Sequence, residues 1–279
     1  MQRREFLGAN ALALASGTVA AAGRLAAAEP AQAEHADRPN HLAPEVQMQF
    51  LRPGQLEAAG RKFPVVYVPF GLIEWHGRHL PLGNDAIKAH GILVKCAEQF
   101  GGVVYPPVYF HAGFKQEHLV PVLTDLFTRL KRTGFRVILG VSGHNVREQI
   151  EMIDKALAPV IADGTATGKG YWEMTLSRGP ESNSDHAAKW ETSNMMFLYP
   201  ELVDMAELGD GPLNLDMKPP SGIGGQDPRQ HASATVGQRN VELAAEALGC
   251  KARELLESLP EDQRAFSLKT VSPEHWWLV

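Results

Sequence analysis

The sequence has few cysteines and no surplus of positive charge. Its 279 residues include only Cys96 and Cys250, too few for a disulfide framework and too few to hold a metal ion through thiolates. We expect both to be small buried hydrophobic residues. The formal net charge of −5 gives no indication of a nucleic-acid partner. There is no internal repeat and no long low-complexity tract, so the composition is that of an ordinary globular protein.

The N-terminal segment lacks an uninterrupted apolar run that would favour a membrane-spanning helix, because Gly17 and Arg24 break it. It has instead the order of a secretory signal, with paired arginines in "RREFLG", then an Ala/Leu-rich stretch, then small residues. We expect residues 1–36 to form a twin-arginine signal peptide, cleaved between residues 26 and 36, and residues 37–279 to form one globular domain. An amphipathic helix or a membrane anchor is the alternative. The expected location is the periplasm, reached through the twin-arginine export machinery, which carries folded and often cofactor-loaded proteins.

Strand patterns alternate with helix patterns along the rest of the chain. Strands are expected at 64–71, 103–110, 135–143 and 168–176, and helices at 85–102, 116–134, 145–164, 190–203 and 235–259. This alternation predicts an α/β fold with a mainly parallel sheet covered on both faces. In such sheets the ligand site lies off the carboxyl ends of the strands, which is where "IEWHG" and "GVSGH" occur.

Acidic and histidine side chains follow two of these strands. Glu74 and His76 are two residues apart, so both point to the same side of an extended strand end. A short loop with Gly77, Pro81 and Gly83 then leads to Asp85, which we expect to cap the next helix. His144 ends the third strand. Histidine with carboxylates is a donor set for Zn²⁺, Mn²⁺ or Fe²⁺, and one bridging carboxylate would allow two ions.

The other histidines favour a plainer interpretation. A lone histidine is more often a surface or hydrogen-bonded side chain than a metal ligand, and this applies to His90, His111, His118 and His231. His275, beside the terminal "WW" pair, is expected to serve packing or an oligomer contact.

Four segments, in this order, resemble the creatininase (creatinine amidohydrolase) family: "FGLIEWHGRHLPLGND", "SGH" at a strand end, "DHAAKWETSNMMFLYPELVD" and "GIGGQDPRQHASATVGQRNVELAAEAL". The resemblance runs from about Pro64 to Leu255. It implies an α/β/α sandwich, a two-metal centre of Zn²⁺ and/or Mn²⁺ with Fe²⁺ as a further possibility, and assembly into hexamers.

The resemblance also implies roles for individual residues. It assigns metal ligation to Glu74, His76, Asp85, His144 and Glu191. Asp85 is in the place of the bridging carboxylate, His186 corresponds to the catalytic histidine, and Trp172 to a pocket tryptophan that closes over the substrate. In that scheme two ions lower the pKa of a bridging water, the hydroxide attacks the amide carbon, and His186 passes a proton to the leaving nitrogen.

One segment departs from the family pattern. "SGHNVRE" replaces the usual "NGHGGN", with Ser142 in place of the first Asn. Creatininase proper has a metal-ligating acid two positions after the histidine, and Val146 cannot serve as one. Glu191 or Glu148 is then left to complete the second ion, or that ion is weakly held. Arg147 introduces a possible extra cation beside the metals.

The sequence therefore predicts a metal-dependent amidohydrolase that cleaves a C–N bond in a small amide, either cyclic or formamide-like. A linear amide or short peptide is the runner-up substrate. A third interpretation is a metal-dependent sugar lyase or isomerase, and a fourth is a non-catalytic periplasmic protein that binds a metal or another ligand. The expected partners are the small amide substrate and further copies of the chain, with no nucleic acid and no stable membrane anchor.

Overall fold

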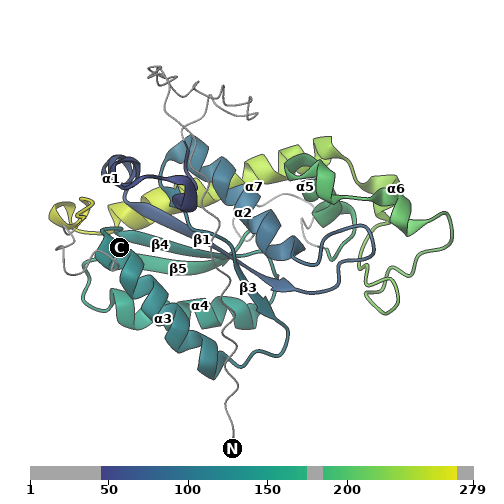
Figure 1. Cartoon of the computed structure of the whole chain (residues 1–279), viewed down its shortest axis with the longest axis horizontal. Helices are drawn as coiled ribbons and strands as arrows, with labels where there is room; N and C mark the ends of the chain where they lie inside the picture. The colour runs from purple at the N-terminus through teal and green to yellow at the C-terminus, as the bar shows by residue number, and fades with distance from the viewer. Residues whose placement is uncertain (1–44, 175–184, 269–279) are drawn as a thin grey trace, which may run out of the picture. The chain divides into compact units, whose positions relative to one another are not determined.

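The computed structural model describes residues 45–174 and 185–268 (Figure 1). The expected signal peptide and His275 lie outside these residues. The strands are β1 (Val65–Ile73), β2 (Val103–Val104), β3 (Val108–His111), β4 (Val137–Ser142) and β5 (Thr167–Trp172). The α-helices are α1 (Pro53–Lys62), α2 (Asn84–Phe100), α3 (Gln116–Thr133), α4 (Arg147–Ile161), α5 (Lys189–Leu198), α6 (Pro228–His231) and α7 (Ala234–Glu257). None of the helices described is long and apolar enough to cross a membrane.

The strands form one parallel sheet in the order β2-β1-β4-β5, with β3 pairing further along β1. Successive residues of β1 face opposite layers. Tyr67 packs in a cluster with Ile92 of α2 and Leu248 of α7. Val68 packs on the other side with Phe127 of α3 and Ile153 of α4. Both faces of the sheet are therefore covered by helices (Figure 1), and the prediction of an α/β/α sandwich with a mainly parallel sheet is confirmed.

Prolines set two boundaries that the sequence pattern placed differently. The strand expected at 103–110 is two strands, β2 and β3, because Pro106 and Pro107 lack the N–H that would continue the ladder. Helix α5 ends at Leu198 and not at 203, because Pro200 disfavours helical geometry in the residue before it, Tyr199. Cys96 is buried as expected, but Cys250 is exposed, so the expectation of burial was wrong for that residue.

The register of the sheet aligns the carboxyl ends of three strands. Phe70 of β1 lies opposite Ser142 of β4, and Ser142 lies opposite Trp172 of β5. The chain leaves β1 toward β2 and β3 on one side and later forms β4 on the other side. The gap between β1 and β4 is thus the point where the strand order reverses, the usual ligand position in such sheets.

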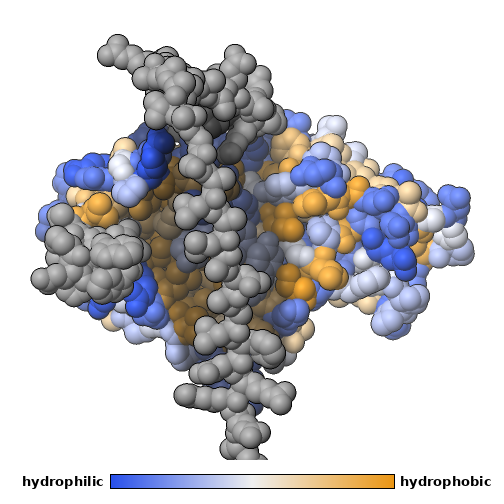
Figure 2. All heavy atoms as spheres, viewed as in Figure 1, coloured by the Kyte–Doolittle hydropathy of each residue, from blue (hydrophilic) through white to orange (hydrophobic). Residues whose placement is uncertain are grey.

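Away from this edge, the segment around α6 is mostly hydrophilic on its outer surface (Figure 2).

Candidate metal centre

The end of β1 supplies the first two side chains of the site. His76 is fully buried, and its Nδ1 lies 3.3 Å from the backbone carbonyl oxygen of Glu74. Because a carbonyl can only accept a hydrogen bond, Nδ1 carries the proton, and Nε2 faces the neighbouring carboxylates. Nε2 lies 3.0 Å from Asp85 Oδ1, 3.6 Å from Glu191 Oε2 and 3.8 Å from Glu74 Oε1.

Asp85 occupies the centre of the site. The expectation that it caps α2 was wrong: the cap position is Gly83, and Asp85 is the second residue of the helix. Its Oδ2 instead accepts a hydrogen bond of 3.2 Å from the backbone N–H of Leu72, and this draws the carboxylate to the strand end. A Cβ on Gly143 would lie 1.9 Å from the Asp85 carbonyl oxygen. Glycine at position 143 therefore lets the first turn of α2 approach the end of β4.

His144 follows that glycine and faces the same two carboxylates. Its Nδ1 lies 3.0 Å from Glu74 Oε1 and 3.3 Å from Asp85 Oδ2. The Ser142 hydroxyl accepts a 3.0 Å hydrogen bond from the His144 backbone N–H and donates one of 2.8 Å to the His144 carbonyl oxygen. Serine in this position thus fixes the turn that aims His144 into the site.

The segment that begins α5 brings His186 and Glu191 over the strand ends. The Asp185 carboxylate accepts hydrogen bonds from the backbone N–H groups of Trp190 at 2.7 Å and Glu191 at 3.1 Å, and so stabilises the first turn. The His186 backbone bridges to Gly224, and its Nδ1 donates to the Gly222 carbonyl oxygen at 2.9 Å. The His186 ring stacks on that of His76, with 4.5 Å between the centroids.

These side chains form overlapping donor groups suited to metal ions. Within the described residues, three trios have ligand atoms within 4.8 Å of one another: Glu74, His76 and His186; Glu74, Asp85 and His144; and His76, Asp85 and Glu191. Asp85 belongs to two trios, as a bridging ligand requires. His76 Nε2 and Glu74 Oε1 are buried and make no hydrogen bond of acceptable geometry in the described part of the chain. Buried unpaired donors and acceptors of this kind fit a divalent cation between them.

The electrostatics of the protein alone show how strongly these groups act on each other. Partial burial would raise the pKa of Glu74, but the neighbouring imidazole rings of His144 and His186 outweigh it and lower this pKa to about 2. Burial would lower the pKa of His144, but Asp85 and Glu74 outweigh it and raise this pKa to about 10. The pKa of Asp85 is also lowered, against the effect of its burial, by His144 and His76. Metal binding must therefore displace protons, and metal affinity falls as the pH falls.

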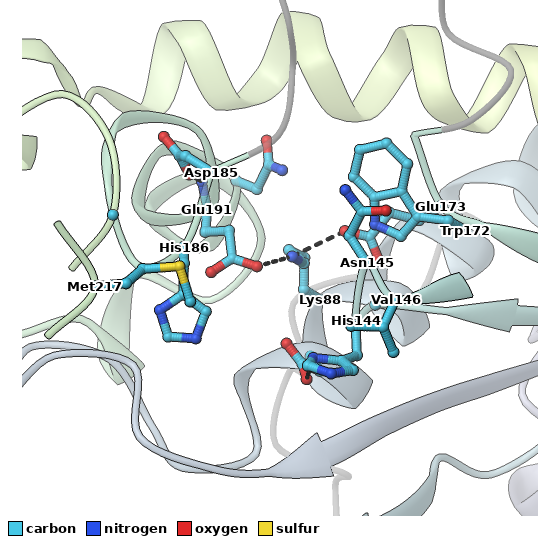
Figure 3. A pocket seen from close by; sticks show the side chains of 14 residues that line it. Lys88, His144, Asn145, Val146, Trp172, Glu173, Asp185, His186, Glu191 and Met217 are labelled. Atoms are coloured by element: carbon cyan, nitrogen blue, oxygen red, sulfur yellow. Dashed lines mark hydrogen bonds and ion pairs between the residues drawn. The ribbon is translucent and has the colours of Figure 1, made fainter. Parts of the chain in front are cut away.

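The centre opens into a cavity of about 270 Å³. His186 and Met217 lie on one side of it, and Trp172, Asn145 and Val146 lie on the other (Figure 3). The indole N–H of Trp172 is buried and has no hydrogen-bond partner within residues 45–174 and 185–268. Trp172 lines the cavity, and its closure over a substrate stays a prediction.

The structure distinguishes between Glu191 and Glu148, the two acids that the sequence left as candidate ligands of the second ion. Glu191 belongs to a trio of donors and Glu148 to none of those in the described chain. Arg147 is not beside the site either: its side chain is exposed and pairs with Glu151 at 2.7 Å. The histidines expected outside the site are indeed outside it: His90 lies near the Tyr199 hydroxyl, and the others are exposed, namely His111, His118 and His231.

Two charged residues of the site were missed by the sequence analysis. Lys88 is 2% exposed, and its Nζ lies 2.8 Å from Glu173 Oε1 and also pairs with Glu191 (Figure 3). Burial by itself would lower the pKa of Lys88, but Glu173 and Glu191 raise it overall. Burial also raises the pKa of Glu173, to about 7. The sequence did contain a signal for Lys88. It comes three residues after Asp85, and residues with this spacing lie on the same face of a helix.

His79, the second histidine of "IEWHGRHL", is a structural residue with a testable effect on stability. It is 1% exposed, and its Nε2 lies 2.8 Å from Thr192 Oγ1. Burial, with His76 adding to it, lowers its pKa from 6.5 to about 4. The unfolded chain takes up this proton near pH 6.5 and the folded chain only near pH 4. The contribution of His79 to the free energy of unfolding therefore decreases by about 3 kcal/mol as the pH is lowered from 6.5 to about 4.

Urea unfolding at pH 7 and pH 4.5 tests this expectation with His79→Gln, which keeps a donor toward Thr192. We expect the variant to lose less stability on acidification than the wild type. Asp185 and Glu173, whose pKa values are raised, act in both proteins and cancel in the comparison. Equal losses in both proteins would contradict the assignment.

Comparisons with known proteins identify the family of this chain. The family model described as creatinine amidohydrolase matches residues 50–250. The creatinine amidohydrolase of Pseudomonas putida is 26% identical over 182 aligned residues, with 53% of this chain and 69% of that protein covered. The mycofactocin precursor peptide peptidase of Mycobacterium ulcerans is 26% identical over 170 residues, with 53% of this chain and 64% of that protein covered. The chain thus spans about two thirds of the length of these relatives.

Solved structures show the same fold. A creatininase crystal structure matches with a TM-score of 0.64 and 19% identity, covering 76% of this chain and 99% of the other. Two further creatininase structures, one described as a Zn–Zn type of a mutant and one as a Mn form, have TM-scores of 0.59 and 0.61, with 20% and 21% identity, and each covers 75% of this chain and 98% of its own. Because the family model covers most of the sequence and the fold agrees, the chain belongs to the creatininase family of amidohydrolases.

Proposed function

We propose that this protein is a metal-dependent amidohydrolase that hydrolyses the C–N bond of a small amide, cyclic or formamide-like. The observation that carries the proposal is the pair of donor trios that share Asp85 at the floor of a cavity. Glu74, Asp85 and His144 would hold one divalent ion, and His76, Asp85 and Glu191 offer a second position. Zn²⁺ or Mn²⁺ suits these donors, with Fe²⁺ as a further possibility. A bound divalent ion supplies Lewis acidity, which acidifies water and polarises an amide carbonyl.

The side chains around the centre can handle the proton and the substrate. Because His186 donates Nδ1–H to the Gly222 carbonyl, its Nε2 is the nitrogen that faces the site, 3.7 Å from Glu74 Oε1. Nε2 is therefore placed to take a proton from attacking water and to pass it to the leaving nitrogen. The Trp172 indole N–H, which has no hydrogen-bond partner among the described residues, can donate to a polar group of the substrate. The cavity of about 270 Å³ favours a small molecule.

A peptide substrate is the second candidate, and one observation favours it. A further cavity of about 190 Å³ shares His144 and Val146 with the site cavity, and its lining includes the apolar residues Phe110 and Met152. Together the two cavities could accommodate an extended ligand. One of the relatives of this chain is a peptide peptidase, which supports the same possibility.

Export and assembly are further parts of the proposal. We propose that the chain is exported by the twin-arginine pathway to the periplasm and acts there as a homo-oligomer, by resemblance a hexamer. The support is the "RREFLG" pattern of residues 3–8 and the family membership.

A screen of amides in H₂¹⁸O tests the proposed reaction. The substrates are creatinine, small cyclic amides, N-formyl amines and short peptides, each tested with and without Zn²⁺ or Mn²⁺. We expect metal-dependent turnover of a small amide, at a rate at least about tenfold above the peptides, with one ¹⁸O in the acid product. Faster peptide cleavage would favour the second candidate. An isomerised or eliminated product without ¹⁸O would indicate a lyase or isomerase, and binding without turnover would indicate a binding protein.

A further inference from the structure

Lys88 is a buried cation directly beside the metal centre. It lies on α2 one turn after Asp85 and is 2% exposed. Its Nζ pairs with Glu173 Oε1 at 2.8 Å and with Glu191 Oε1. A lysine is almost never fully buried unless it is paired, so these two carboxylates are what hold the ammonium at this depth. In Figure 3 it lies between Glu191 and the Glu173 side of the cavity.

The ion pair with Lys88 occupies Glu191, one of the acids that a second metal ion would need as a ligand. Glu191 Oε1 is bonded to Lys88, and Oε2 accepts a hydrogen bond of 2.8 Å from the backbone N–H of Ala187. The same Oε2 is the atom that faces His76 Nε2, at 3.6 Å. Any ion in the trio of His76, Asp85 and Glu191 would thus bind a carboxylate already neutralised by an ammonium group.

The trio of Glu74, Asp85 and His144 differs in this respect. None of its members is among the ion-pair partners of Lys88 in the described residues. Two of its three donors are carboxylates, and neither is paired with Lys88, whose charge acts on Asp85 only at longer range than on Glu191. Val146, which lines the cavity beside His144, brings no acid that could compensate for the loss at Glu191.

We propose that the Lys88 ammonium group takes the place of part of the positive charge that a second metal ion would bring. The protein then holds one divalent ion firmly, at Glu74, Asp85 and His144, and a second ion only weakly. The inference rests on the proposed metal-dependent function. The physical reason is that a fixed ammonium repels a divalent ion at short range in a poorly solvated site. A carboxylate paired with that ammonium also attracts the ion less.

Metal content of the folded protein tests this inference. The wild type, purified without added metal, is loaded with Zn²⁺, dialysed against a weak chelator and measured by elemental analysis and by titration calorimetry. Lys88→Gln keeps a hydrogen-bond donor but removes the charge. Lys88→Met/Glu173→Gln removes the charge without leaving Glu173 ionised and unpaired. Lys95→Met, on the same helix with its side chain 41% exposed, is the control, and circular dichroism checks that each variant folds.

We expect about one ion per chain in the wild type and the control, and about two in both Lys88 variants. The affinity for the second ion should rise roughly tenfold or more, and the affinity for the first should stay unchanged. Two firmly held ions in the wild type would overturn the inference. Loss of the second ion in the Lys88 variants would also overturn it and would make Lys88 a support for Glu191. No metal in any protein after loading would refute the proposed function itself.

Discussion

Replacement of Asp85 by Asn is expected to strip the protein of metal and to abolish its activity. Asp85 is 1% exposed, and it is the only residue shared by the trios of Glu74, Asp85, His144 and His76, Asp85, Glu191 in the described structure. Asn keeps the shape and can still accept the Leu72 N–H, but it lacks the charge. We expect metal content to fall below about 0.2 ions per chain, and kcat/KM for the best amide by about 10³-fold or more, since metal catalysis contributes several kcal/mol.

The matched control for this experiment is Asp125→Asn. Asp125 is exposed on α3, pairs with Arg129 and belongs to none of the donor trios of the described residues, so its loss should leave metal content and rate unchanged. Elemental analysis and steady-state kinetics on the same preparations give both results. An Asp85→Asn variant that keeps its metal would show that the ion is held elsewhere.

His186→Asn is expected to lower the rate while leaving the metal in place. The Asn amide nitrogen can keep the hydrogen bond that His186 Nδ1 makes to the Gly222 carbonyl, so the backbone of this segment should not move. What is lost is Nε2, the nitrogen that faces the centre. Proton transfer by a positioned side chain contributes about 10²–10⁴-fold, and we expect kcat to fall within that range, with little change in KM.

Metal content decides how the result for His186 is interpreted. His186 also belongs to a donor trio with Glu74 and His76. Unchanged metal content with a low kcat would support proton transfer, whereas a parallel loss of metal would make His186 a ligand. His118→Asn is the control, because His118 is an exposed histidine on α3, and we expect it to behave as the wild type.

Much of the site could be predicted from the sequence because parallel strands end at one edge. Once β1 and β4 are identified as neighbouring strands of a parallel sheet, Glu74 and His144 must lie close together, since both follow a carboxyl end. Asp85 comes to the same edge because only a short loop separates β1 from α2. The positions of His186 and Glu191 came from the family resemblance, because no local pattern places α5 over the strand ends.

The details that failed were those that depend on contacts between distant residues. Asp85 was expected to cap its helix, which is the usual role of an aspartate at a helix start, but the Leu72 N–H on β1 competes for its carboxylate. Arg147 was considered as an extra cation at the site, yet it begins α4 on the solvent side and pairs with Glu151.

The sequence by itself determined the alternation of strands and helices, the edge of the sheet that carries the site, and the His and carboxylate donors that predict a metal ion. These features follow from short-range patterns and from the parallel direction of the strands. Only the tertiary structure brings Glu191, and not Glu148, into a donor trio of the described residues and places the buried Lys88 beside it. Lys88, Glu173 and Glu191 come from three separate segments, and a charge becomes a site residue only when folding removes it from water next to its partners.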